Sequence, residues 1–134
     1  TWSEGLRSEV PDRLEHIVSR IAHAFGATAR FTFEPGNAGL ANDSTCAEVA
    51  RQAVIDTLGD QGVADYRGTL SGEDFSEYLR IVPGVFCFVG TRNPQVGADH
   101  PQHSCHYTVD EDVLAKGSMV AAQWACRMLS GAKG

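Results

Sequence analysis

Hydrophobic positions near the start of the chain repeat at the spacing of an α-helix. From Val10 to Phe25 they recur at intervals that place them on one face of a helix: Val10, Leu14, Ile17, Val18, Ile21 and Phe25. Pro11 fits only the first turn of a helix, so we expect the regular helix to begin near Ser8, with Ser8 as its N-cap, or to bend at the proline. Gly26 is the expected C-cap. The pattern predicts a helix that buries one apolar stripe.

Two other segments have the pattern of β-strands. Between Thr28 and Glu34 apolar and polar side chains alternate, which is typical of a strand with one buried face, and Pro35 then interrupts the alternation. The run Val85–Val89 is apolar throughout, as expected of a strand that is covered on both faces.

Capping residues mark further helices. Asp43 or Ser44 can cap a helix that ends at Gly59 and directs these apolar side chains toward a core: Cys46, Val49, Ala50, Ala53, Val54 and Leu58. Residues 71–74 have the pattern of a capping box. They predict a short helix that ends before Pro83 and turns three side chains inward, namely Phe75, Tyr78 and Leu79.

The last helix is expected to begin near Asp110, with Val109 and Leu114 placed as a hydrophobic staple. It is expected to bury Leu114, Ala121, Trp124, Ala125 and Met128. The resulting order is helix, strand, helix, helix, strand, helix. This order predicts an α/β chain in two unequal parts, with a break near residues 35–42.

Composition narrows the class of protein. The length of 134 residues is that of one ordinary domain. The net charge of -6 argues against the basic surface that nucleic-acid binding requires. No apolar run is long enough to span a membrane, and the N-terminus lacks the layout of a signal peptide. The four scattered cysteines fit a reducing compartment. We expect a soluble, cytoplasmic protein that binds neither nucleic acid nor membranes.

A loop of about twenty residues separates Gly90 from the last helix, and loops of that length are more often functional than decorative. It contains three histidines at intervals of three, His100, His103 and His106, and imidazole is a preferred ligand for zinc, manganese and cobalt. The spacing alone is also that of ordinary surface histidines. Cys105 is a weaker candidate ligand.

A second candidate site lies at the start of the short helix. Gly72 would allow a ligand to approach the backbone closely, and Glu73 or Asp74 would touch that ligand or support a metal ligand. The alternative is structural, since carboxylates at a helix start are favoured by the helix dipole.

Four motifs occur in order along the chain: Gly72–Phe75, Val82–Gly84 with the apolar run 85–89, His103-Ser104, and Asp110–Asp112. Together they resemble the C-terminal end of the hippurate hydrolase, N-acyl-amino-acid amidohydrolase and auxin-conjugate hydrolase family, which is related to aminoacylase and carboxypeptidase G. Residues 1–3 resemble the residues that come just after the strand that opens the second half of the family's lid domain. Residues 41–43 resemble its return to the catalytic domain.

The resemblance implies a fold and an assembly. Residues 1–36 would be half of an α/β lid, or dimerisation, domain. Residues 37–134 would be the C-terminal part of a zinc-peptidase-like α/β catalytic domain. Lids in this family pair, so a homodimer is expected, with the helix from Val10 to Phe25 and the strand from Thr28 to Glu34 as interface candidates.

The resemblance also implies an activity. The whole enzyme would hydrolyse the amide of N-acyl amino acids or related peptide-like substrates with two divalent metal ions (Zn, Mn, Co or Ni). Its motif match makes His103 a metal ligand. Gly72, Glu73 and Asn42 would contact the substrate, and Ser104 and Asp74 would support the ligands around them.

The chain departs from the family pattern in two respects. Cys105 stands where the family has proline, and neither His100 nor His106 matches a ligand position. The family's other ligands and its catalytic glutamate precede the lid, and no such element occurs in this sequence. We therefore expect a fragment that binds metal weakly and has no catalytic residue or activity of its own.

Two alternatives from other classes stay open. The chain could act as a non-catalytic binding or oligomerisation module, because an unpaired strand edge favours association. It could also be a small zinc-binding protein that uses His100, His103 and either Cys105 or His106.

Overall fold

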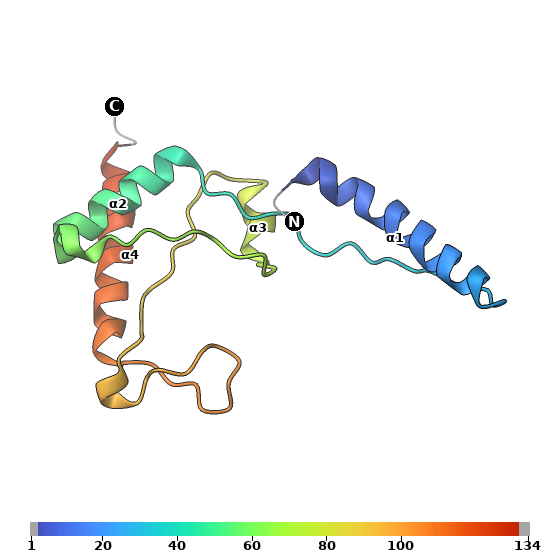
Figure 1. The fold of residues 1–134 in the computed structure, drawn as a ribbon. Helices are drawn as coiled ribbons and strands as arrows, with labels where there is room; N and C mark the ends of the chain where they lie inside the picture. The colour runs from blue at the N-terminus through green and yellow to red at the C-terminus, as the bar shows by residue number, and fades with distance from the viewer. Residues whose placement is uncertain (1–2, 132–134) are drawn as a thin grey trace. The chain divides into compact units, whose positions relative to one another are not determined.

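The computed structural model describes residues 3–131 of the chain. Its helical elements are α1 (Glu4–Ala24), α2 (Ser44–Leu58), the 3-10 turn η1 (Asp60–Gly62), α3 (Phe75–Leu79), the 3-10 turn η2 (Pro94–Val96) and α4 (Asp112–Gly131) (Figure 1). Thr1 and Trp2, which belong to the predicted lid match at residues 1–3, lie outside the described range. Among the described residues, no helix is both long and apolar enough to cross a membrane.

The chain divides into two compact units. Residues 1–41 and 67–82 form the first unit, and residues 42–66 and 83–134 form the second. The first crossing, after residue 41, lies at the end of the break predicted near residues 35–42. The return of residues 67–82 to the first unit was not predicted. The division into a lid at residues 1–36 and a catalytic part at residues 37–134 stays a prediction.

Helix α1 begins earlier than predicted. Ser3 is its N-cap, and the Ser3 hydroxyl accepts a hydrogen bond from the Leu6 N–H at 3.2 Å. Pro11 therefore lies inside the helix, so the predicted start near Ser8 is wrong. The helix ends one residue before the predicted cap: Phe25 is the C-cap. Gly26 follows it with a φ of +67°, and its N–H donates to the His23 carbonyl at 2.9 Å.

The apolar stripe of α1, defined as Leu14, Ile17, Ile21 and Phe25, is exposed, whereas the sequence predicted its burial. The exposed fractions are 40% for Leu14, 51% for Ile17, 56% for Ile21 and 85% for Phe25. The physical reason is that no other helix of the described residues packs on α1. The chain after Gly26 runs back beside α1 as an extended segment (Figure 1). There the Arg7 guanidinium donates to the Gly36 carbonyl.

The two predicted strands are extended but not paired, so the α/β class is not realised within the described residues. Neither residues 28–34 nor residues 85–89 belong to a strand, and the structure has only an isolated antiparallel bridge between Asn93 and Ala98. A strand exists only through hydrogen bonds to a partner, and no segment between residues 3 and 131 provides one. Phe88 and Val89 are accordingly 57% and 53% exposed, against the prediction of burial on both faces.

The core of the second unit lies between α2 and α4, as the sequence predicted in part. Asp43 caps α2 by accepting from the Cys46 N–H at 2.8 Å, and Gly59, with a φ of +80°, closes it. The buried side chains of α2 are small, namely Cys46, Ala50 and Ala53, which lets α4 approach closely. From α4, the Trp124 indole N–H donates to the Cys46 carbonyl at 3.2 Å.

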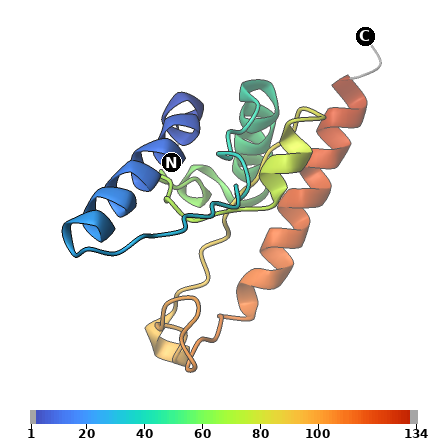
Figure 2. The same ribbon diagram turned by 90° about the vertical axis from the view of Figure 1, so that its right-hand side faces the viewer.

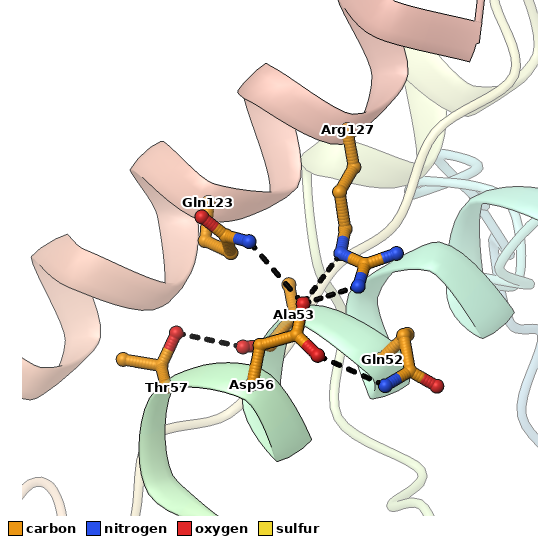
Figure 3. Close-up of polar contacts among 6 residues, drawn as sticks. All are labelled: Gln52, Ala53, Asp56, Thr57, Gln123 and Arg127. Atoms are coloured by element: carbon orange, nitrogen blue, oxygen red, sulfur yellow. Dashed lines mark hydrogen bonds and ion pairs between the residues drawn. The ribbon is translucent and has the colours of Figure 1, made fainter.

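Polar contacts also join these two helices at Asp56 (Figure 3). Its carboxylate accepts hydrogen bonds from Gln52 at 3.0 Å, from Gln123 at 3.2 Å and from the Arg127 Nε at 2.7 Å. These bonds, that from Gln52 first and then those from Arg127, lower the pKa of Asp56. Leu114 is 56% exposed, so its predicted burial is wrong; Ala121 is exposed as well. No side chain of α4 is fully buried in the described part of the chain.

Candidate functional site

The residues singled out by the sequence lie in both units. Gly72, Glu73 and Asp74 belong to the first unit, and Asn42, His103 and Ser104 belong to the second.

The loop that carries His103 is closed at its base by Asn93 and Asp110. In Figures 1 and 2 this loop lies at the N-terminal end of α4. The Asn93 side-chain amide donates to the Asp110 carboxylate at 2.8 Å, and the Asp110 N–H donates to the Thr91 carbonyl at 3.1 Å. Asp110 also accepts from the Asp112 N–H at 3.1 Å, which confirms that it marks the start of the last helix. The bond from Asn93 is the main reason why the pKa of Asp110 is lowered.

His103 has an unusual backbone conformation. Its φ is 66°, and it is the only residue other than glycine with a positive φ in the part of the chain that the structure describes. A non-glycine residue in this region costs about 1–3 kcal/mol, and such residues concentrate at functional sites. The imidazole is exposed. The left-handed conformation reverses the direction of the chain at the predicted metal ligand.

Ser104 stabilises the same turn. Its N–H donates to the Pro101 carbonyl at 3.2 Å, and its carbonyl accepts from the Tyr107 N–H at 3.0 Å. Its hydroxyl accepts from the His106 N–H at 3.2 Å. The structure thus gives Ser104 a defined role in holding the turn. Its predicted support of a metal ligand stays a prediction.

A set of three or more metal-binding side chains is not found among residues 3–131. The described residues therefore do not fit a two-metal centre, since one imidazole cannot hold such a centre. The three-ligand zinc site built from His100, His103 and either Cys105 or His106 is not assembled among the described residues, and it stays a prediction. His103 as a single ligand stays a prediction.

The carboxylates around α3 hold the first unit together. The Glu73 carboxylate accepts from the Phe75 N–H at 3.1 Å, and Asp74 accepts from the Asn37 side chain. The predicted capping box is wrong, because the helix begins at Phe75 and Ser71 instead bonds to Thr69. Gly72 has open space around it, since a Cβ there would meet no atom within 4 Å.

The role of Glu77 was not predicted from the sequence. Its carboxylate accepts from the Ala38 N–H at 3.1 Å and pairs with Arg80 at 3.0 Å. The bond from Ala38 is the main reason why the pKa of Glu77 is lowered. The predicted inward side chain of Tyr78 is 65% exposed, and the buried residue of α3 is Ser76.

The Asn42 side chain forms hydrogen bonds with the backbone of the extended segment that follows Pro83. Its side-chain amide donates to the Phe86 carbonyl at 3.0 Å, and its side-chain oxygen accepts from the Phe86 N–H at 2.8 Å. The neighbouring Asp43 N–H donates to the Gly84 carbonyl at 3.0 Å. We call these three bonds the Asn42 clamp. Its predicted contact with a substrate stays a prediction.

Comparisons with known proteins give consistent matches. The sequence model described as "Peptidase family M20/M25/M40" matches residues 5–127. The chain is 33% identical to thermostable carboxypeptidase 2 of Saccharolobus solfataricus over 124 residues. This match covers 92% of this chain and 31% of that protein. It is 36% identical to the IAA-amino acid hydrolase ILR1-like 6 of Arabidopsis thaliana, covering 88% of this chain and 26% of that protein.

A third relative is the N-acetyl-L-cysteine deacetylase of Bacillus subtilis. It is 30% identical over 129 residues, which cover 96% of this chain and 29% of that protein. The chain thus spans less than a third of the length of these three relatives. No solved structure matches the chain.

Proposed function

The chain belongs to peptidase family M20/M25/M40, and from this membership we propose that it is part of a hydrolase that cleaves amide or peptide bonds. The observation that carries the proposal is the family match over residues 5–127. The four ordered motifs from Gly72 to Asp112 lie within the matched range and resemble the amidohydrolase branch of such enzymes. The activity is assigned to the whole protein that contains this chain.

N-acyl amino acids are the proposed substrates within that class. The names carboxypeptidase, IAA-amino acid hydrolase and N-acetyl-L-cysteine deacetylase each describe breaking a bond to the nitrogen of an amino acid. The product they share is an amino acid with a free amino group. A substrate pocket shared by such enzymes would recognise the amino acid part, while the acyl group varies.

Residues of this chain would contribute binding groups rather than a complete catalytic centre. Glu73 uses one carboxylate oxygen for the Phe75 N–H, which leaves the other oxygen to accept from a substrate donor. Open space at Gly72 supports the proposal that a substrate reaches the backbone there. His103 is proposed as a ligand for a divalent ion of the Zn, Mn, Co or Ni class, which imidazole suits.

We also propose that α1 mediates a homodimer. The apolar stripe of α1 is exposed along most of the helix, and burying apolar surface favours association by about 25 cal/mol per Å². A double variant, Ile17→Glu with Ile21→Glu, should shift the protein from dimer to monomer in light scattering. The matched control Glu15→Gln lies on the same helix outside the stripe and should leave the dimer intact. A wild-type monomer at high concentration would contradict this proposal.

The assay for the hydrolase measures release of free amino acids from three substrates: N-acetyl-L-cysteine, benzoylglycine and a dipeptide. Each is compared with its methyl ester, which lacks the free carboxylate. The 134-residue chain and the longest naturally encoded protein that contains it are both tested with added Zn, Mn, Co or Ni. We expect the longer protein to release amino acids from the substrates that have a free carboxylate. No release from any substrate by either protein would contradict the proposal.

A further inference from the structure

The imidazole rings of His100 and His106 lie close together, although five residues separate them in the sequence. Their ring centroids are 5.3 Å apart and the ring planes are tilted by 44°. The turn between them brings the rings together, because His103 reverses the chain with its positive φ and Ser104 bonds to Pro101. Backbone hydrogen bonds thus hold the two histidines at opposite ends of one turn.

This separation also fits a shared metal ion. A zinc–nitrogen bond of about 2.0–2.1 Å places the ion about 3.2 Å from the centre of each ring, so two rings at a tetrahedral angle have centres about 5.2 Å apart. The observed 5.3 Å agrees with that value.

The surroundings of the pair favour a cation. The Asp99 carboxylate lies 3.8 Å from the His100 Nε2, and it places a negative charge beside the ring. His100 is 49% exposed at its side chain, and His106 is exposed as well, so an ion and its bound water can enter. The closed base of the loop, from Asn93 to Asp110, holds this arrangement in place.

We propose that His100 and His106 form a surface site for one exchangeable transition-metal ion of the zinc, nickel or copper class. Imidazole suits these ions, and water would complete the coordination because no third metal-binding side chain of the described residues joins the pair. The site is separate from the role proposed for His103 and does not depend on it. Because the ion would link the two ends of the turn, it would also hold His103 in its reversed conformation.

Cu²⁺ is the most sensitive probe, because it binds nitrogen ligands more tightly than the other divalent ions of its row. The exposed thiols of Cys87, Cys105 and Cys126 are first alkylated, because free thiols reduce Cu²⁺. The metal-free 134-residue chain is then titrated with Cu²⁺, and electron paramagnetic resonance reports the number of coordinated nitrogens. We expect one ion per chain with two imidazole nitrogens, and displacement by excess Zn²⁺. His100→Ala and His106→Ala should each leave one nitrogen and weaken binding about tenfold or more, because the second ligand acts at high effective concentration.

Two controls separate this site from other histidines. His16→Ala and His23→Ala remove exposed imidazoles of α1 and should leave the affinity unchanged. His103→Ala should preserve the two-nitrogen signal, so failure of the His103 proposal would not affect this result. Should an alanine variant lose its circular dichroism signal, His100→Gln and His106→Gln replace it. Unchanged affinity in both variants at positions 100 and 106, or loss of the signal in His103→Ala, would overturn the proposal.

Discussion

Replacing Asn42 by alanine should loosen the segment that follows Pro83. The substitution removes both side-chain bonds of the Asn42 clamp, at 3.0 Å and 2.8 Å, and leaves the Asp43 to Gly84 backbone bond in place. It creates no cavity, because Asn42 is exposed. The change therefore isolates the contribution of the two hydrogen bonds to Phe86.

The expected cost follows from the number of bonds. An intramolecular hydrogen bond contributes about 0.5–1.5 kcal/mol net, so two bonds give about 1–3 kcal/mol. Water can reach the Phe86 backbone in the variant, since the bonds lie at the surface, which places the expected loss at about 1–2 kcal/mol. Asn42→Asp keeps an acceptor for the Phe86 N–H but places an anionic oxygen against the Phe86 carbonyl.

The measurement is the free energy of unfolding in urea, together with hydrogen exchange at the Phe86 amide. We expect Asn42→Ala to lower the free energy and to speed exchange at Phe86. The aspartate variant should recover part of the loss below about pH 4, where its acid form can donate to the carbonyl. Gln102→Ala, an exposed amide with no hydrogen bond to the rest of the described chain, is the matched control. An unfolding free energy within about 0.5 kcal/mol of wild type would refute the clamp.

Three further changes test the packing and the loop. Gly26→Ala should cost about 1–2 kcal/mol in urea unfolding, because alanine is strained at the φ of +67° that ends α1; an unchanged value would contradict the cap. Ala53→Leu should cost about 1–3 kcal/mol, because Ala53 is fully buried where α2 meets α4, and thermal melting would show it. Asp110 has a lowered pKa, so its contribution to stability is present above its unfolded pKa and lost as pH falls through the folded value. Urea unfolding between about pH 6 and about pH 2 should therefore depend less on pH in Asp110→Asn than in wild type.

The ends of α2 and the glycine after α1 could be predicted from the sequence because capping is local, whereas the capping box predicted at residues 71–74 is wrong. Asp43 lies within three residues of the N–H that it accepts, and Gly59 and Gly26 supply the backbone conformations that their own positions require. The start of α1 was missed because Pro11 argued for a later start. Ser3 offered a cap eight residues before the proline, and the helix accommodated the ring.

Burial and strand pairing could not be predicted in the same way because both depend on partners. The stripe of α1 and the run Val85–Val89 have the right side chains, but among the described residues no other helix packs on the stripe and no strand pairs with the run. Periodicity states which face is apolar and does not state what packs on it.

The sequence predicted which residues belong to the candidate site, but not the contacts that these residues make. The motif around His103 singled out one histidine of three, and the left-handed backbone at that position is consistent with a special role. The contacts of Asn42 with Phe86 join residues 44 positions apart, and those of Asn93 with Asp110 join residues 17 apart. No local pattern reveals such pairs.

The most direct test of His103 as a metal ligand compares wild type with His103→Ala in the longest naturally encoded protein that contains this chain. The quantity is kcat/KM for release of the amino acid from an N-acyl amino acid, with Gln102→Ala as the control from the same loop. Residues that only orient metal ligands alter activity about 10–100-fold, so loss of a ligand should lower kcat/KM by more than about 100-fold. The control should keep the wild-type value. A His103→Ala variant that folds and retains kcat/KM within about threefold of wild type would contradict the central assignment.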